Sequence, residues 1–441
     1  HNLAPQNTIG QSNNYQALGV AVKPGDKVNI YIGSSRKDTK FDLVLTQFNA
    51  ESGTAYKVIN ELTVGKNEIE IPETGFDMNY EKGGIRDIGL KLCSPRDMLF
   101  YARVRKGIEI PHLNLNNIID YENKENEAKE AIRTYIRELK SYVNSLPNRY
   151  PASADIIDNT NNIYTYDPQT SILNATEIEG ERITLSLAAD QVLSGIQSGL
   201  SGNEDAEVDR LYNTLLAWEQ IMKVSYVQQG LLEEAIDFDK DGSITNTPLD
   251  ILNGKSEIQY YNENRAPKNR INIKYQRMFT GAFMYASSHH VGVGYGSIAG
   301  LMSAVPFKFD SAGNLVNSED GQLFGWGIAH EIGHVHDRPG LTYAETTNNI
   351  LALITQTFND INESRIEISD GYVKVYDKVT SNSVGLASDG LTKLAMFWQL
   401  HLAYDNDYTY KMLDLNTDDN LENDTFYAKL YRATRINGVA P

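Results

Sequence analysis

The sequence predicts a multidomain fold, in which an N-terminal, jelly-roll-like β-sandwich precedes an α+β domain with a mostly helical C-terminal part. Three observations predict it. The chain has 441 residues, enough for two or three domains with real cores. Short apolar–polar alternations fill residues 1–110, and stretches with helical periodicity begin near Asn116. We therefore expect divisions into residues 1–112, 113–345 and 346–441.

The first domain is predicted from short segments in which apolar and polar residues alternate. They are residues 17–22, 27–32, 41–45 and 99–104. Turns that carry Gly, Pro or Asn separate them at regular spacing, which is typical of a sandwich or jelly roll. We expect an accessory β-domain here, with a carbohydrate-binding role as an equal alternative.

Apolar residues at helical or strand spacing predict the elements that follow. The predicted helices are residues 121–146, 188–197, 208–227 and 390–403, and the predicted strands are residues 182–185, 272–276 and 286–295. Pro147 ends the first of these helices. In the third helix, Trp218 belongs to an apolar stripe, so we expect it in the core.

Residues 330–334 read His-Glu-x-x-His within an apolar helical stripe. Residues four apart lie on one face of a helix, so His330 and His334 can bind one zinc ion. Glu331 is then placed to act as general base on the attacking water. The Pro-Gly pair at 339–340 ends the helix. His336 points off the zinc face, and we interpret it as a surface or support histidine.

A zinc site of this type needs a third protein ligand. Gly340 stands where one zincin class has a histidine, six residues after His334, so that class is excluded. We expect Glu345 to be the ligand, near the start of a helix over residues 343–353. Glu363 and Glu367 are the alternatives. Asn349 lies one turn after Glu345 and is predicted to orient a zinc-bound histidine.

Two patterns together resemble the M60-like (enhancin-type) zinc metallopeptidases. They are Gly-Trp-Gly-x-x-His-Glu-x-Gly-His at 325–334 and Glu-Thr-Thr-Asn-Asn at 345–349. Weaker similarities lie in residues 22–26, 108–111, 283–296 and 394–401. The resemblance implies a gluzincin-type zincin domain with a downstream Glu as third ligand. It also implies an O-glycosylated protein or mucin as substrate, because bacterial members of the family cleave such proteins.

Residues 237–244, Asp-Phe-Asp-Lys-Asp-Gly-Ser-Ile, match the first part of a calcium-binding loop. The candidate Ca²⁺ ligands are Asp237, Asp239, Asp241 and Ser243. Pro248 stands where an EF-hand has its bidentate Glu, so a complete EF-hand is excluded. Asp250 is a candidate for a later carboxylate. The alternative is a polar turn without an ion.

Two further segments carry candidate substrate-binding residues. Gly292 and Gly294 would let a peptide backbone approach an edge strand beside a zincin cleft, with Tyr295 next to them. His401, in the late helix, is a candidate oxyanion-stabilising group. A structural role is the alternative for both segments.

The composition of the chain indicates which classes of partner and which cellular location to expect for the protein. The formal net charge is −18, which argues against nucleic acid or an anionic membrane as partner. Cys93 is the only cysteine, so no intrachain disulfide is possible. No segment is apolar enough for membrane insertion. The two ends look processed or cut, so we expect flanking modules. We also expect a monomer that is secreted or displayed at a bacterial cell surface.

The function predicted from these features is that of a secreted zinc endopeptidase for O-glycosylated proteins, with Glu331 as general base. Zn²⁺ is the expected cofactor, and Ca²⁺ a possible second one. One alternative is a general zincin peptidase without a glycan requirement. The other is a non-catalytic glycan-binding adhesin with a vestigial zinc site. The presence of Glu331 argues against the adhesin, because binding needs no general base.

Overall fold

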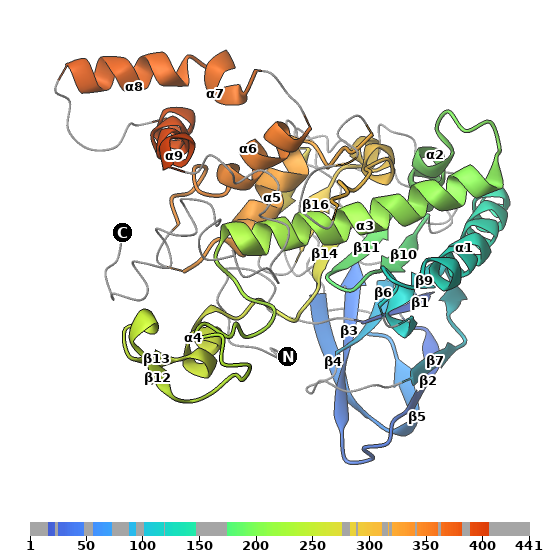
Figure 1. Ribbon diagram of the computed structural model, residues 1–441. Helices are drawn as coiled ribbons and strands as arrows, with labels where there is room; N and C mark the ends of the chain where they lie inside the picture. The colour runs from blue at the N-terminus through green and yellow to red at the C-terminus, as the bar shows by residue number, and fades with distance from the viewer. Residues whose placement is uncertain are drawn as a thin grey trace. The chain divides into compact units, whose positions relative to one another are not determined.

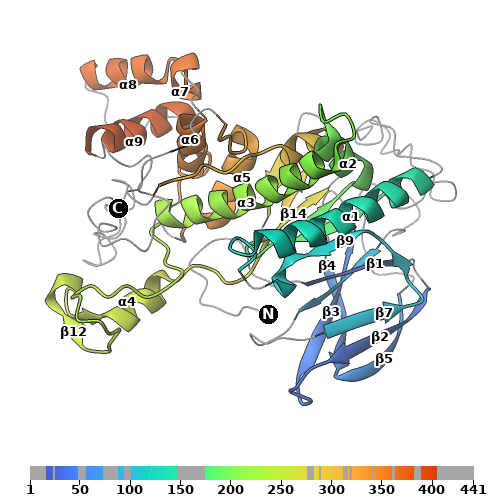
Figure 2. The same cartoon turned by 45° about the vertical axis from the view of Figure 1, so that its right-hand side comes forward.

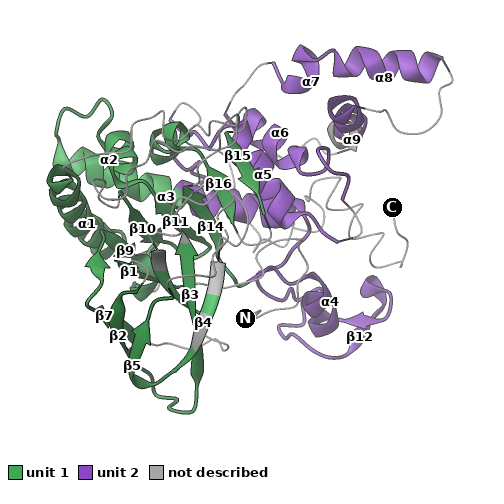
Figure 3. Ribbon diagram, turned by 180° about the vertical axis from the view of Figure 1, so that it is seen from behind, with its two compact units in different colours: residues 1–3, 12–216, 268–303 green, residues 4–11, 217–267, 304–441 purple. Residues whose placement is uncertain are grey.

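The structure is a computed structural model, and its secondary structure is shown in Figure 1. It describes residues 16–22, 25–47, 56–72, 88–93, 101–118, 120–146, 174–275, 283–287, 290–310, 316, 320–339, 342–359, 363–381 and 389–404. The chain forms two compact units (Figure 3). Unit 1 holds residues 12–216 and 268–303, and unit 2 holds residues 217–267 and 304–441, apart from short N-terminal pieces. The predicted division into residues 1–112, 113–345 and 346–441 differs from these two units, and it stays a prediction.

Two antiparallel sheets of unit 1 share one hydrophobic core. The larger has the order β4 (Tyr56–Thr63), β3 (Lys40–Gln47), β6 (Ile88–Cys93), β1 (Gln16–Val22) and β8 (Ile108–Glu109), and the smaller has the order β5 (Gly65–Glu70), β2 (Lys27–Gly33) and β7 (Tyr101–Arg105). Alternate residues point inward, so that Ile30 of β2, Phe41 of β3 and Leu92 of β6 are fully buried in that core. Three of the predicted strands are confirmed as β1, β2 and β3. The described part of the fourth, residues 101–104, lies in β7, and residues 99 and 100 lie outside the described residues.

A mixed six-stranded sheet forms the rest of the framework of unit 1. Its order is β15 (Met284–Ala286), β16 (Val291–Val293), β14 (Ile271–Tyr275), β11 (Ile183–Leu187), β10 (Thr176–Glu179) and β9 (His112–Asn114). Every residue of β10, β11, β14 and β16 is buried. β10 was not predicted because its sequence, Thr-Glu-Ile-Glu, is mostly polar. Its buried carboxylates are paired with Lys91 and Arg270 of other strands or loops, which a local pattern does not reveal.

Two buried lysines join the five-stranded sheet to the six-stranded sheet within unit 1. Lys91 of β6 donates a hydrogen bond of 2.9 Å to Ser186 Oγ of β11. Lys274 of β14 donates one of 2.7 Å to Thr46 Oγ1 of β3. Burial lowers the pKa of both lysines. The strands expected to form a separate first domain are therefore bonded to the central sheet.

The segment predicted as one strand over residues 286–295 contains a shorter strand, β16, which forms a hairpin with β15 just before it. β15 and β16 pair antiparallel, and β15 is the edge strand, so the expectation that Gly292 lies on an edge strand was wrong. A side chain at Gly292 would meet the ring of Tyr285, with its Cβ 2.2 Å from a ring carbon. The glycine is required by this ring and not by an approaching peptide.

Helices connect these sheets and form most of unit 2. They are α1 (Glu125–Ser145), α2 (Ala189–Gln197), α3 (Glu204–Gln228), α4 (Glu257–Asn264), α5 (Trp326–His336), α6 (Asn349–Phe358), α7 (Arg365–Ile368), α8 (Gly371–Thr380) and α9 (Gly390–Tyr404). The four predicted helices are confirmed as α1, α2, α3 and α9. Trp218 is fully buried, as expected, with its ring centroid 4.0 Å from that of Phe324. Within the described ranges, no helix has the length and hydrophobicity to cross a membrane.

Candidate metal centre

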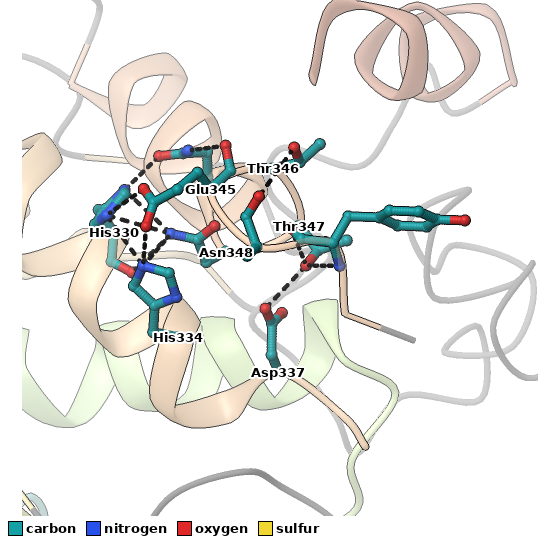
Figure 4. Close-up of polar contacts among 10 residues, drawn as sticks. His330, His334, Asp337, Glu345, Thr346, Thr347 and Asn348 are labelled. Atoms are coloured by element: carbon teal, nitrogen blue, oxygen red, sulfur yellow. Dashed lines mark hydrogen bonds and ion pairs between the residues drawn. The ribbon is translucent and has the colours of Figure 1, made fainter. Parts of the chain in front are cut away.

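Helix α5 places two histidines side by side. Its bounds, Trp326–His336, agree with the prediction from the His-Glu-x-x-His spacing. His330 and His334 are one turn apart, and their Nε2 atoms lie 3.2 Å from each other (Figure 4). Burial and the neighbouring His330 lower the pKa of His334, which favours the neutral imidazole that a metal requires.

Glu345 reaches both histidines from a turn that precedes α6. Its Oε2 lies 3.3 Å from His330 Nε2, and its Oε1 lies 3.2 Å from His334 Nε2 (Figure 4). The expected helix over residues 343–353 was placed too early, because α6 begins at Asn349. Glu345 has a φ of 56°, in the left-handed region, so it cannot lie within a right-handed helix. The turn, and not a helical face, presents the carboxylate.

The spacing of these three donor groups fits zinc. Ligands about 2.0–2.1 Å from a tetrahedral zinc ion lie about 3.3 Å from one another. The three observed separations between His330, His334 and Glu345 are 3.2, 3.2 and 3.3 Å. Two imidazole nitrogens and a carboxylate oxygen are the donor set of a catalytic zinc site that keeps a fourth position for water.

Glu331 is the neighbouring acid of the same helix. Its side chain is buried, and one of its carboxylate oxygens lies within 4.8 Å of a ring nitrogen of His330 and of His334. A carboxylate this close to the metal ligands is within reach of a water molecule in the fourth position. The position agrees with the role expected for Glu331.

Asn349 contacts both a histidine and the Glu345 turn. His330 Nδ1 lies 2.6 Å from Asn349 Oδ1, and Asn349 Nδ2 donates a hydrogen bond of 3.0 Å to the Glu345 carbonyl. Asn348, which the sequence did not single out, also borders the site. Its Nδ2 lies 3.0 Å from His334 Nε2, and its Oδ1 is buried without a hydrogen-bond partner among the described residues.

The residue at position 333 of the zinc motif must be glycine, because the backbone of Asn348 packs against it. A Cβ atom at this position would lie 2.1 Å from the carbonyl oxygen of Asn348. Any side chain would therefore push the turn away from α5, and with it Glu345. The glycine allows the close contact on which the geometry of the three donors depends.

Asp337 and His336 support the site from inside unit 2. Thr347 Oγ1 donates a hydrogen bond of 2.9 Å to Asp337 Oδ2 and accepts one of 3.2 Å from Tyr343 N, so it links the turn to the end of α5. Burial raises the pKa of Asp337 to about 7. His336 is fully buried, with Nδ1 2.7 Å from Ser225 Oγ, and burial lowers its pKa to about 3. It is a support histidine, and the surface alternative was wrong.

Trp326 and Arg365 form an aromatic–cation pair that the sequence analysis missed. Trp326 lies four residues before His330, on the same face of α5. The guanidinium carbon of Arg365 lies 4.6 Å from the centre of the Trp326 ring. The spacing from Trp326 to the zinc motif was the signal available in the sequence. The position of Arg365, on α7, required the fold.

The alternative third ligands have other positions. Glu367 Oε2 accepts a hydrogen bond of 2.6 Å from Ser364 N in the capping box of α7. Glu363 is exposed just before that helix. Neither makes a described contact with His330 or His334, whereas Glu345 contacts both.

The candidate substrate-binding residues are on other elements than the metal centre. Gly292, Gly294 and Tyr295 belong to unit 1, whereas the metal centre belongs to unit 2. Tyr295 is buried, and its hydroxyl donates a hydrogen bond to Asp190 Oδ2, which favours a structural role. His401 lies in α9, but its side chain is outside the described residues.

The predicted calcium loop forms a compact acidic turn in unit 2. Asp237 Oδ2 accepts a hydrogen bond of 2.8 Å from Gly242 N, and Asp241 Oδ1 accepts one of 2.9 Å from Ser243 N. Carboxylate oxygens of Asp237, Asp239 and the buried Glu257 lie within 4.8 Å of one another. Among the described residues, the later carboxylate that lies beside the loop is therefore Glu257 and not the candidate Asp250.

Comparison with known proteins identifies similar sequences and folds. A family model described as Peptidase M60, enhancin and enhancin-like, matches residues 242–439. A search of curated proteins gave no match. Three solved structures from Clostridium perfringens are similar to the whole chain, with identities of 19–22%, a level that shows the shared fold.

The first is the M60 catalytic domain of ZmpB with its CBM51-1 and CBM51-2 domains, with 20% identity, a TM-score of 0.58, and coverage of 96% of this chain but 37% of that chain. The ZmpB metallopeptidase has 19% identity and a TM-score of 0.57, over 97% of this chain and 74% of the other. The M60 catalytic domain of ZmpC has 22% identity and a TM-score of 0.56, over 97% and 70%. The chain thus spans about a third of the first structure's length.

Proposed function

We propose that this chain, which belongs to the M60 family of enhancin and enhancin-like metallopeptidases, is a zinc-dependent endopeptidase that cleaves O-glycosylated proteins. The observation that carries the proposal is the spacing of His330, His334 and Glu345, whose donor atoms are 3.2–3.3 Å apart. Asn349 forms a hydrogen bond with Nδ1 of His330, so that the other ring nitrogen, Nε2, is the atom that can bind the metal.

The reaction we propose is hydrolysis of a peptide bond. A zinc ion held by these residues supplies a Lewis acid that polarises the scissile carbonyl and acidifies water. Glu331 takes a proton from the attacking water and delivers it to the leaving amide nitrogen. The lowered pKa of His334 keeps its imidazole neutral, so it stays a ligand near neutral pH.

The Trp326–Arg365 pair supports a glycan requirement. An aromatic ring offers a stacking surface for a sugar, and a guanidinium offers several hydrogen-bond donors for its hydroxyl groups. Both lie in the unit of the metal centre, and Trp326 is one turn from His330. The related ZmpC structure is a complex with the sialyl T antigen, which supports a glycan-binding site in this fold. We propose that Trp326 and Arg365 bind the sugar attached near the cleaved bond.

The test compares one peptide with and without an O-linked sugar on a Ser or Thr beside the cleaved bond. We expect the glycopeptide to be cut at least about a hundredfold faster, because polar groups built for the sugar stay unpaired without it. Equal rates would favour the general zincin peptidase. Zinc binding with no cleavage of either peptide would favour the glycan-binding adhesin.

Variants of the pair locate the glycan requirement. Trp326→Ala and Arg365→Ala should slow cleavage of the glycopeptide and leave zinc content unchanged, since neither side chain is a metal donor. Trp326→Phe, which keeps an aromatic ring, is the matched control and should retain more of the rate than Trp326→Ala. Wild-type rates in both alanine variants would refute this location.

The remaining parts of the proposal concern location and assembly. We propose a secreted or cell-surface protein that acts as a monomer and carries flanking modules, as the ZmpB structure with its CBM51 domains does. Light scattering on the purified chain tests the monomer. Fractionation of the source cells tests the location. A bound Ca²⁺ at the Asp237 loop is proposed as a structural ion.

A further inference from the structure

We propose that the outer face of the sheet β5–β2–β7 is a second carbohydrate site, which binds acidic glycan chains bearing carboxylate or sulfate groups. Figure 2 shows these three strands as neighbours in the N-terminal region of unit 1. The identity of the ligand rests on the proposed function, because an O-glycoprotein substrate brings such chains to the protein. The site itself is argued from the side chains of this face.

The pairing of the strands brings basic groups around one tyrosine. Tyr31 of β2 is directly opposite Lys66 of β5 and directly opposite Arg103 of β7. Opposite residues of an antiparallel pair point to the same side of the sheet, so all three lie on the outer face. Arg105, two residues further along β7, has its guanidinium carbon 6.0 Å from the centre of the Tyr31 ring.

A second tyrosine lies on the same face beyond an open position. Tyr101 of β7 is paired with Gly33 of β2, and its side chain is 75% exposed. A Cβ atom at Gly33 would meet no described residue within 4 Å, so among the described residues nothing covers the sheet between Tyr101 and Tyr31. The two exposed rings and the glycine beside them give an aromatic surface on which a sugar chain can lie.

The charge of this face is unlike that of the whole chain. Its acidic groups are already paired: Glu70 lies 3.3 Å from Lys27, and Glu68 lies 2.5 Å from Lys66. Within the described ranges, Arg103 and Arg105 have no acidic partner. In a chain of net charge −18, two arginines without a counter-charge on one exposed strand indicate an anionic ligand.

The chemistry of the face favours a glycan over other anions. The guanidinium group binds carboxylate and sulfate oxygens through two parallel hydrogen bonds. The aromatic surface of Tyr31 and Tyr101 can stack on pyranose rings. The aliphatic residues of these strands, such as Ile30 and Val104, point into the core, so the face presents no exposed aliphatic side chain of these strands to a lipid surface.

The test measures binding of the full chain to a sialylated mucin and to the same mucin after sialidase treatment. The background is Glu331→Gln, so that the probe is not cleaved. We expect the double variant Arg103→Ala/Arg105→Ala to bind sialylated mucin at least about tenfold more weakly, because charge-assisted hydrogen bonds are lost. Tyr31→Ala should weaken binding too. The matched control is Arg36→Ala/Lys37→Ala, which removes the same charge from the exposed β2–β3 connection and should bind normally.

Four outcomes would overturn the proposal, of which three come from the mucin assay. These three are unchanged binding by the Arg103/Arg105 variant, equal loss in the Arg36/Lys37 control, and equal binding of the desialylated mucin by the parent protein. Stronger binding to phosphatidylserine vesicles than to mucin would overturn it as well, in favour of an anionic lipid surface as the ligand.

A cleavage assay separates this site from the proposed function. In the active background, the Arg103/Arg105 variant should cut a short neutral glycopeptide at the wild-type rate within about twofold, because that substrate is too small to need a second site. If neither the wild type nor any variant cuts the neutral glycopeptide, the peptidase proposal is refuted. The mucin-binding result would still decide whether the second carbohydrate site exists.

Discussion

The Nδ1 atom of His330 lies 2.6 Å from Asn349 Oδ1, while the amide nitrogen of Asn349 donates to the carbonyl of Glu345. One side chain therefore fixes the ring of a proposed zinc ligand and the turn that presents another. The hydrogen bond at Nδ1 assigns the proton to that nitrogen and leaves Nε2 to the metal.

Asn349→Ala should weaken zinc binding about 10–100-fold, because the ring and the turn both lose their support. Competition with a chromogenic chelator measures the affinity. Asn359→Ala is the matched control, since Asn359 lies at the end of the same helix and binds the backbone of Leu323. An equal loss of affinity in both variants would show that Asn349 acts only through stability.

Removal of the Glu345 carboxylate should reduce zinc content sharply, because two histidines alone leave the site underligated. Glu345→Ala and Glu363→Ala are compared by metal analysis after dialysis against a fixed free zinc concentration. Glu363→Ala should retain zinc, since it makes no described contact with either histidine. The reverse ranking would contradict the assignment of Glu345.

The stability of the protein should depend on pH through Asp337. Burial raises the pKa of this carboxyl to about 7, so the folded protein keeps a proton that the unfolded chain releases between about pH 4 and 7. The free energy of unfolding should therefore fall as the pH rises through this window, by up to about 1.4 kcal/mol per pH unit.

Asp337→Asn removes this titration while keeping an oxygen acceptor for Thr347. Urea unfolding with a chelator present gives the free energy of unfolding of both proteins at about pH 4.5 and about pH 7.5, near the two ends of this pH range. The variant should gain stability relative to wild type at the higher pH. An equal difference at the two pH values would contradict the raised pKa.

Calcium should raise the melting temperature if the Asp237 loop holds an ion, because a ligand that binds only the folded state stabilises it. Asp239→Ala should remove that response, whereas Asp250→Ala should keep it, since Glu257 and not Asp250 joins Asp237 and Asp239. If calcium does not change the melting temperature of the wild type, the loop is a polar turn without a bound ion.

The sequence was most informative where a local pattern decides the structure. The spacing of His330 and His334 predicted α5, and alternation predicted strands such as β2, because each depends on neighbouring residues alone. The position of Glu345 was predicted by residue but not by conformation. Its left-handed φ is held by contacts of Thr347 and Asn349, which no periodicity reveals.

Other features required the fold, because distant residues create them. Arg365 meets Trp326 only through the packing of α7 near α5. The basic face around Tyr31 depends on the register that places Lys66 and Arg103 on its two sides. The 286–295 segment was predicted as a single strand because the turn between β15 and β16 carries no Gly or Pro.

The most direct test of the account is the zinc content and the cleavage rate of Glu331→Gln, measured on one preparation with an O-glycosylated peptide. The three proposed ligands remain in this variant, so zinc should be bound as in wild type. Turnover should fall by about 100-fold to 10,000-fold, because the amide of Gln cannot take the proton from water. Full zinc content with activity within about tenfold of wild type would contradict the role of Glu331 as general base, and with it the proposed mechanism.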